Sequence, residues 1–143
     1  MQVLYTASAT ASGDGRDGRV ETSDGTLALD LAVPKEMGGA GGAANPEQLF
    51  AAGYAACFHS ALRLVGRRAK ADVSDSVVAA EVGIGPNGSG GFGLTVRLVV
   101  DLPAVSRETA EQIVEQAHQV CPYSNATRGN IDVALTVRET LAA

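Results

Sequence analysis

The sequence predicts an α+β fold in which antiparallel strands pack against two main helices. Six extended segments are marked by alternating apolar residues, three before residue 34 and three between residues 77 and 137. Two segments with helical spacing, residues 45–68 and 106–118, separate groups of strands and not single strands. Such grouping, without regular strand–helix alternation, is typical of the α+β class. With 143 residues, we expect a single domain over residues 1–143.

The first three segments predict an antiparallel meander. Residues 3–11 alternate, carry little turn chemistry and end at a glycine-containing turn over residues 12–18. Residues 19–22 resume an extended strand, and Ser23-Asp24-Gly25 is a strong hairpin signal. Leucines at alternate positions then predict the third strand over residues 27–33.

A glycine-rich connection, residues 34–44, leads from the meander to the first helix. It is longer than most connections within a domain. It either covers a functional feature or is a disordered linker, and the sequence leaves both readings open.

The first helix, residues 45–68, has a well-marked start. Asn45 is a favoured N-cap, Pro46 suits the first helical position, and Glu47 lies where the helix dipole favours a carboxylate. Five of the six residues from 51 to 56 are Ala or Gly. They are too small to fill a core, which suggests that another backbone approaches this helix closely.

A single cysteine, Cys57, lies at the centre of this helix. Apolar and small residues recur around it at helical spacing and place it on a stripe that faces other protein, so we expect its thiol to be mostly enclosed. The stripe comprises Phe50, Gly53, Tyr54, Cys57, Ala61 and Leu64. An incidental core cysteine explains the same pattern, because free cysteine is among the most buried residue types.

The second half of the chain predicts a hairpin, a helix and a final strand. Residues 77–84 and 92–102 form two extended runs around a turn rich in glycine. Ser106 is the expected cap of a helix that runs to about His118, and residues 131–137 alternate as the last strand. The apolar face of that helix comprises Ala110, Ile113, Val114 and Ala117.

Composition and charge argue against several classes of protein. The net charge is −5 and the eleven Lys and Arg residues are dispersed, which argues against nucleic acid as the main partner. The N-terminus lacks a basic region followed by an apolar core, and we find no apolar run near the about 20 residues of a membrane span. We therefore expect a cytoplasmic protein without a membrane partner. Aromatic residues make up only 4%, so the core is built from Val, Leu, Ile and Ala, and such a core suits sharing between subunits.

The second cysteine, Cys121, has its own local signal. Pro122 directly after it and Gly129 farther on predict one short helix that starts at Cys121. A helix N-terminus favours a thiolate, whereas a cysteine in a plain loop is the alternative. Two cysteines in a chain without an export signal are typical of catalytic or redox chemistry more than of a structural disulfide framework.

The two histidines raise the question of a metal site. Cys57-x-His59 and His118-x-x-Cys121 supply two Cys and two His. Residues two apart on a helix point about 200° apart, so Cys57 and His59 do not converge on one ion. The same geometry argues against a Cys57–His59 dyad, and the sequence identifies no group that would orient His118. We expect no metal and interpret both histidines as bystanders.

Arg16 and Glu47 allow two interpretations. Burial raises the pKa of a cysteine, so a reactive Cys57 needs a nearby cation, and an arginine in that site needs a carboxylate partner. Arg16, in the glycine-containing turn, and Glu47 can fill these two roles. A solvated turn arginine and a first-turn acid explain the same residues equally well.

Three stretches together resemble the organic hydroperoxide resistance proteins of the Ohr/OsmC family. They are Gly15-Arg16-Asp17-Gly18, the fourteen residues from Asn45 to Phe58 around Cys57, and the eleven residues from Val120 to Asn130 around Cys121. The two cysteine blocks are highly specific in combination, and the resemblance spans nearly the whole chain. It favours a nucleophilic role for Cys57 over that of a core residue.

The resemblance implies an OsmC-like fold, an intertwined homodimer with two active sites that both subunits build. It implies reduction of organic hydroperoxides, alkyl or lipid, by a thiol mechanism. Cys57 matches the peroxidatic cysteine, Cys121 the resolving cysteine, Arg16 the activating arginine, and Glu47 the carboxylate that holds this arginine. No cofactor is implied; the expected reductant is an external dithiol, a dihydrolipoyl group on a lipoylated protein.

Six residues with apolar side chains are candidates for lining a substrate pocket near Cys57, and they favour organic hydroperoxides over hydrogen peroxide. They are Leu49, Phe50, Tyr54, Phe58, Met37 and Phe92. His59-Ser60 and Asp14 depart from the family pattern and leave substrate preference open. The alternative function is a non-enzymatic redox sensor or binding protein that uses the same two cysteines as a switch.

Overall fold

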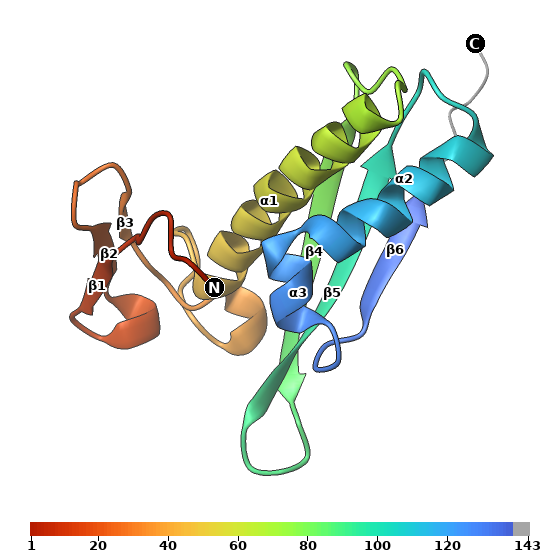
Figure 1. Ribbon diagram of the computed structural model, residues 1–143. Helices are drawn as coiled ribbons and strands as arrows, with labels where there is room; N and C mark the ends of the chain where they lie inside the picture. Colours follow the sequence, from red (N-terminus) through yellow and green to blue (C-terminus); the bar gives the residue numbers. More distant parts are fainter. Residues whose placement is uncertain (139–143) are drawn as a thin grey trace. The chain divides into compact units, whose positions relative to one another are not determined.

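A computed structural model describes residues 1–138 of the chain. It has the α+β fold that the sequence predicts, with the predicted order of strands and main helices (Figure 1). The chain divides into two compact units, one up to Leu49 and one from Phe50 onward, and each is described by itself. The single domain over residues 1–143 stays a prediction.

The first unit contains the predicted meander. Strands β1 (Ala9–Ser12), β2 (Arg19–Thr22) and β3 (Ala28–Asp30) pair antiparallel in that order. The first and third strands are shorter than predicted, because β2, the strand with which both pair, has only four residues. The pairing of β1 with β2 begins at Ala9, which lies opposite Thr22 at the end of β2. Beyond β3, Leu31 forms an isolated bridge with Ala44, and its N–H donates to the carbonyl of Gly18 at 2.8 Å.

The connection over residues 34–44 is held by its own hydrogen bonds. It begins with a 3₁₀ helix, η2 (Lys35–Met37). The N–H of Gly41 donates to the carbonyl of Val33 at 3.0 Å, and the N–H of Ala32 donates to the carbonyl of Ala44 at 2.9 Å. These bonds close the segment into a loop, which argues against the linker interpretation.

Helix α1 (Pro46–Arg68) begins where the sequence predicts. Asn45 Oδ1 accepts a hydrogen bond from the N–H of Gln48 at 2.9 Å, and Gln48 Oε1 accepts one from the N–H of Asn45 at 3.2 Å. Each side chain thus caps the backbone of the other, a reciprocal arrangement that satisfies two N–H groups near the helix start. Asn45 is the cap that the sequence predicts, whereas the contribution of Gln48 was not predicted.

By length and composition α1 could cross a membrane, and within residues 1–138 it is the one helix of which this is true. This corrects the expectation that no segment comes near that length and apolarity. Tyr54, Phe58 and Leu62 of α1 are fully buried within the fold. A core helix of a globular protein has the same property, because most of its residues are apolar.

The second sheet has one feature that the sequence did not predict. Strands β4 (Val77–Pro86) and β5 (Phe92–Asp101) form the expected antiparallel hairpin. Strand β6 (Val133–Val137) pairs with β5 in parallel, where we expected antiparallel strands. The reason is the helical crossover between them, since parallel neighbours need a connection of a dozen residues or more.

That crossover consists of α2 (Arg107–Val120) and α3 (Pro122–Thr127). Ser106 caps α2 as predicted, with its Oγ accepting from the N–H of Thr109 at 3.2 Å. Helices α1 and α2 lie on one face of the second sheet (Figure 1). Between them and the sheet is the core, which includes the four predicted inner residues of α2 (Ala110, Ile113, Val114, Ala117) and Val96, Leu98 and Val100 of β5.

Candidate active site

The two cysteines meet between α1 and α3. Both are free thiols, and the Sγ atoms of Cys121 and Cys57 lie 3.4 Å apart. Cys121 is fully buried, whereas Cys57 is only partly buried. The expectation of a mostly enclosed Cys57 thiol is therefore wrong for the single chain. The buried face of α1 runs through Tyr54, Phe58 and Leu62, and Cys57 lies at its edge.

Local backbone chemistry fixes the position of Cys121, as the sequence predicts. Pro122 occupies the first position of α3, and Cys121 before it has the extended conformation that precedes proline (φ −61°, ψ 124°). The N–H of Cys121 donates to the carbonyl of Ala117 in α2 at 2.8 Å, and its carbonyl accepts from the N–H of Asn125 in α3 at 2.9 Å. Cys121 is thus the corner residue held by both helices.

A glycine on α1 makes room for a side chain of α3. A Cβ at position 53 would lie 2.9 Å from the hydroxyl oxygen of Tyr123. The Tyr123 ring also meets Tyr54 and Phe50 edge to face, with centroids 5.7 and 6.3 Å apart. We expected a backbone to approach the small residues of α1; at Gly53 an aromatic side chain does so instead.

The environment of Cys57 disfavours its thiolate. Burial raises the pKa of the Cys57 thiol, the neighbouring sulfur of Cys121 raises it further, and a hydrogen bond from the backbone of Tyr123 lowers it. The raised pKa agrees with the expectation from sequence. A cation near the sulfur would counter the burial effect by favouring the charged form.

In the first unit, Arg16 and Glu47 form the ion pair that the sequence allowed. Arg16 belongs to a 3₁₀ helix, η1 (Gly15–Asp17), and Glu47 to the first turn of α1. The guanidinium donates from both terminal nitrogens to the two carboxylate oxygens, at 2.8 and 2.7 Å. The hydrogen bond raises the pKa of Arg16 and is the main cause of the lowered pKa of Glu47. With side-chain exposures of 38% for Arg16 and 13% for Glu47, this bidentate contact rules out two independent solvated residues.

A cavity of about 470 Å³ opens beside the Cys57 thiol. Its lining is mostly apolar, with one cation from Arg67, and comprises Cys57, Ser60, Ala61, Leu64, Arg67, Val120 and Pro122. Apart from Cys57, none of these was among the predicted site residues. The signal was present in the sequence, because positions 60, 61, 64 and 67 lie three, four, seven and ten residues after Cys57 and share one helix face with it.

The six predicted pocket residues lie in different surroundings. Phe50 and Tyr54 pack with Tyr123, close to the two thiols. Phe58 is fully buried in the core, and Phe92 is 71% exposed at the start of β5. Leu49 and Met37 belong to the first unit, where Leu49 is half-buried and Met37 is exposed. Their roles as pocket residues stay predictions.

The histidines make separate hydrogen bonds. His59 Nε2 lies 2.9 Å from Ser76 Oγ, and His118 Nδ1 lies 2.8 Å from Ser124 Oγ. Over residues 1–138, no three His, Cys, Asp or Glu side chains are grouped so that they could hold a metal ion. The Ser124 partner of His118 is a fully buried residue of α3. That both histidines are bystanders in the chemistry stays a prediction.

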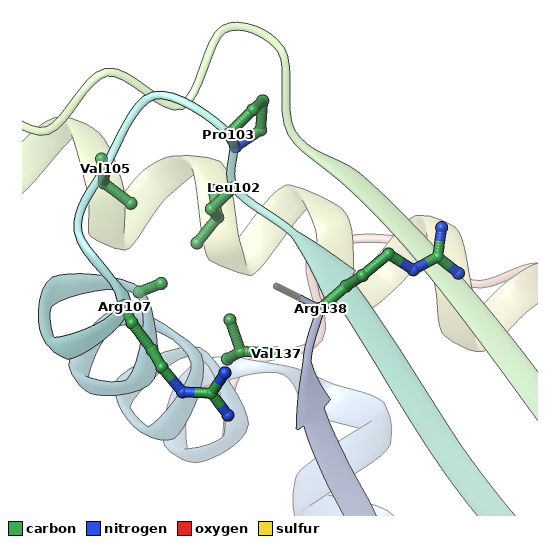
Figure 2. Close-up of a pocket in the computed structure, with 7 residues that line it drawn as sticks. Leu102, Pro103, Val105, Arg107, Val137 and Arg138 are labelled. Carbon is green, nitrogen blue, oxygen red and sulfur yellow. The ribbon is translucent and has the colours of Figure 1, made fainter. Parts of the chain in front are cut away.

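A further cavity of about 290 Å³ lies where the connection from β5 to α2 meets the end of β6 (Figure 2). Its lining comprises Leu102, Pro103, Val105, Arg107, Ala110, Val137 and Arg138. The Arg107 side chain extends beneath Val137, and that of Arg138 points away to the side (Figure 2). This lining includes neither a cysteine nor a histidine, so it offers no nucleophile for thiol chemistry.

Comparison with known proteins places the chain in a family. The family model of OsmC-like proteins matches residues 39–136. An organic hydroperoxide resistance protein from Xanthomonas axonopodis pv. citri is 53% identical over 138 residues, which cover 95% of this chain and 96% of the relative. Organic hydroperoxide resistance protein OhrB of Bacillus subtilis is 46% identical over 138 residues, which cover 94% and 98% of the two chains.

Solved structures agree with the sequence relatives. The crystal structure of organic hydroperoxide resistance protein OsmC from Legionella pneumophila is 52% identical and superposes with a TM-score of 0.92. The match covers 96% of this chain and 100% of that one. The chain therefore belongs to the OsmC-like family, among the organic hydroperoxide resistance proteins.

Proposed function

We propose that this chain is a cysteine-based peroxidase that reduces organic hydroperoxides to alcohols and is regenerated by a dithiol. The observation that carries the proposal is the pair of free thiols 3.4 Å apart, one partly open to a cavity and one fully buried. Relatives at 46% to 53% identity are named for resistance to organic hydroperoxides, which supports the substrate class.

The first step takes place at Cys57. Its thiolate attacks the distal oxygen of the hydroperoxide, an S–O bond forms, and the O–O bond breaks. The departing alkoxide takes up a proton and leaves as the alcohol, while Cys57 becomes a sulfenic acid. Relative exposure supports this role for Cys57, because Cys57 borders the cavity and Cys121 is fully buried.

The second step closes a disulfide. The Cys121 thiolate attacks the sulfur of the Cys57 sulfenic acid, the S–S bond forms, and hydroxide leaves and is protonated to water. The two thiols together have then supplied the two electrons that reduced the peroxide. Closing the 3.4 Å separation to a bond of about 2.05 Å requires only a small movement of the side chains.

Arg16 and Glu47 have proposed roles in the first step. Arg16 would favour the thiolate, donate hydrogen bonds to the peroxide and stabilise the charge on the departing alkoxide. Glu47 would hold the guanidinium in orientation through the bidentate contact at 2.8 and 2.7 Å. The raised pKa of Cys57 within its own unit gives the physical need for such a cation.

The cavity beside Cys57 supports a preference for organic hydroperoxides over hydrogen peroxide. Ala61, Leu64, Val120 and Pro122 offer apolar surface to an alkyl chain. Each buried CH₂ is worth about 0.8 kcal/mol, so a few methylenes add binding that hydrogen peroxide cannot obtain. Arg67 in the same lining would favour substrates that carry an anionic group away from the peroxide.

The reductant and the assembly complete the proposal. A dihydrolipoyl group on a lipoylated protein would reduce the Cys57–Cys121 disulfide, and the cycle as written needs no metal, haem or flavin. We propose a cytoplasmic, intertwined homodimer. Exposed small residues on α1 in the single chain support the dimer, because a second copy of the chain could pack closely against them. They are Ala52, Ala56 and Ser60.

The test compares Cys57→Ser and Cys121→Ser with tert-butyl hydroperoxide and dihydrolipoamide. We expect Cys57→Ser to lose all turnover, and Cys121→Ser to reduce one equivalent of peroxide and accumulate Cys57 sulfenic acid or its overoxidised products. Mass spectrometry of the trapped protein distinguishes these species. A Cys121→Ser protein that no longer reacts with peroxide would contradict the assigned roles. Stoichiometric oxidation of the wild type without turnover would indicate a redox sensor instead.

A further inference from the structure

Four polar side chains form a hydrogen-bonded chain about one helical turn from the thiol pair. His118 Nδ1 lies 2.8 Å from Ser124 Oγ, which lies 2.8 Å from the hydroxyl of Tyr54. The Tyr54 hydroxyl lies 3.1 Å from Thr127 Oγ1, and Thr127 Oγ1 donates to the backbone carbonyl of Ser124 at 3.2 Å. Tyr54 and Ser124 are fully buried and Thr127 nearly so, so water cannot replace these partners.

Counting protons fixes the direction of this chain. Four hydrogen bonds need four protons, and the hydroxyls of Ser124, Tyr54 and Thr127 supply three of them. The fourth must be a proton on His118 Nδ1. The only order that satisfies every contact runs from His118 to Ser124, then to Tyr54, to Thr127 and to the carbonyl of Ser124.

The His118 ring is suited to this role. Burial and the charge of Arg128 lower the pKa of His118, and Glu115 raises it by a smaller amount. The ring is therefore neutral near pH 7, and its single N–H must lie on Nδ1 if the chain is complete. Protonation at lower pH adds a proton at Nε2 and leaves the Nδ1 donor in place.

The hydrogen-bonded chain joins the same two helices as the thiols, one turn away. Tyr54 lies three residues before Cys57 on α1, and Ser124 lies three residues after Cys121 at the start of α3. The two helices therefore meet at two successive points, a sulfur pair and a hydroxyl pair. His118, in the last turn of α2, extends the link to the helix that precedes the Cys121 corner.

We propose that His118, Ser124, Tyr54 and Thr127 position Cys121 opposite Cys57 for disulfide closure. This inference rests on the proposed peroxidase for its biological setting, although disulfide closure can be measured without peroxide. The chain holds the register between α1 and α3, so that the Cys121 sulfur meets the Cys57 sulfur once that sulfur is oxidised. His118 and Ser124 act through Cys121 and do not touch the reacting oxygen atoms.

The experiment measures how readily the two thiols close. Reduced protein is equilibrated with oxidised dithiothreitol, a cyclic disulfide: Cys57 opens it to a mixed disulfide, and Cys121 displaces the resulting dithiol and completes the S–S bond. The fraction of oxidised protein gives the equilibrium constant for closure. Variants are Ser124→Ala, His118→Leu and His118→Asn, because the Asn amide can place an N–H near the position of Nδ1. Ser106→Ala, which removes the cap of α2 away from the thiols, is the control for lost helix stability.

We expect Ser124→Ala and His118→Leu each to lower the closure constant by at least about tenfold, since a misplacement of about 1 Å has effects of this size or larger. His118→Asn should stay near wild type, and so should Ser106→Ala. Wild-type closure in both Ser124→Ala and His118→Leu would overturn the inference. Equal losses in His118→Asn and His118→Leu would overturn the need for an Nδ1 donor, and an equal loss in Ser106→Ala would show a stability effect only.

A second measurement separates this inference from the proposed function. One equivalent of tert-butyl hydroperoxide is mixed with each reduced protein, and peroxide loss and disulfide formation are followed separately. We expect normal peroxide loss in Ser124→Ala, followed by slow disulfide formation. If wild type does not react with peroxide, the peroxidase proposal fails while the equilibrium with oxidised dithiothreitol still decides the positioning role. If Ser124→Ala does not fold, the two His118 variants decide it.

Discussion

Replacement of Tyr54 by Phe tests the hydrogen-bonded chain through stability. The change removes one hydroxyl and keeps the ring, with its contacts to Phe50 and Tyr123. The lost hydroxyl accepts from Ser124 at 2.8 Å and donates to Thr127 at 3.1 Å. The proton of Ser124 then has no acceptor, and Ser124 is fully buried.

The expected loss follows from that unpaired proton. A buried polar group left without a partner costs about 1–3 kcal/mol, so the free energy of unfolding should fall by about 2 kcal/mol. With a urea dependence of roughly 2 kcal/mol per molar, the unfolding midpoint should fall by about 1 M. Ser124→Ala removes the unpaired hydroxyl itself. The double variant, Tyr54→Phe with Ser124→Ala, should therefore lose about 1 kcal/mol less unfolding free energy than the sum of the two single variants.

Urea unfolding of the reduced protein, followed by circular dichroism, measures these values. All variants are compared at one protein concentration, because stability depends on concentration in the proposed dimer. Tyr123→Phe is the matched control: its side chain is exposed, so loss of that hydroxyl should cost less than about 0.5 kcal/mol. A Tyr54→Phe loss no larger than that of Tyr123→Phe, or strict additivity in the double variant, would refute the reasoning.

Three further predictions address other parts of the molecule. In Arg16→Ala the rate of the first oxidation should still increase with pH at pH values above about 8.5, the ordinary thiol pKa, because burial raises the pKa of Cys57; the wild-type rate should level off at a lower pH. Identical pH profiles of the two proteins by stopped flow would exclude a role for Arg16. Gly66→Ala should lose about 1–3 kcal/mol in urea unfolding despite better helix propensity, because its Cβ would lie 2.4 Å from a methyl group of buried Val73; a gain in stability would show that Val73 can move. Hydrogen bonding to Arg16 lowers the pKa of Glu47, so the stabilising contribution of the Glu47 carboxylate is complete above its unfolded pKa of about 4.3 and is lost as pH falls through its folded pKa. Between pH 6 and pH 3.5, Glu47→Gln should therefore lose less stability than wild type, and equal losses in the urea midpoint of the two proteins would contradict this prediction.

Local signals predicted the parts of the fold that local chemistry determines. The start of α1 at Asn45, the cap of α2 at Ser106 and the corner at Cys121 depend on residues close in sequence. The direction of β6 was not predictable in this way, because the path of the whole crossover decides it. The short β1 was missed for a related reason, since the length of a strand depends on the partner that it pairs with.

The site shows the same division. Helix α1 is apolar on most sides, so the stripe through Cys57 and the adjacent one through Phe58 are equally plausible from spacing. Packing selects the second, and this leaves Cys57 at the edge, beside the cavity. The Arg16–Glu47 pair joins residues 31 positions apart, and only family resemblance favoured it over two solvated side chains. No sequence pattern joined Tyr54 to His118, because their link passes through α3.

The parallel pairing of β6 bears on the order in which the molecule assembles. Five residues, 87–91, connect β4 to β5, whereas 31 residues, 102–132, separate β5 from β6. For flexible chains the longer closure costs about 1.6 kcal/mol more entropy at room temperature. We therefore expect the β4–β5 hairpin to form early and β6 to dock late, together with the crossover helices. Because Cys121 lies within that crossover, the two sulfurs come together only at this late stage, and a nascent chain whose hairpin alone has formed still holds its thiols apart.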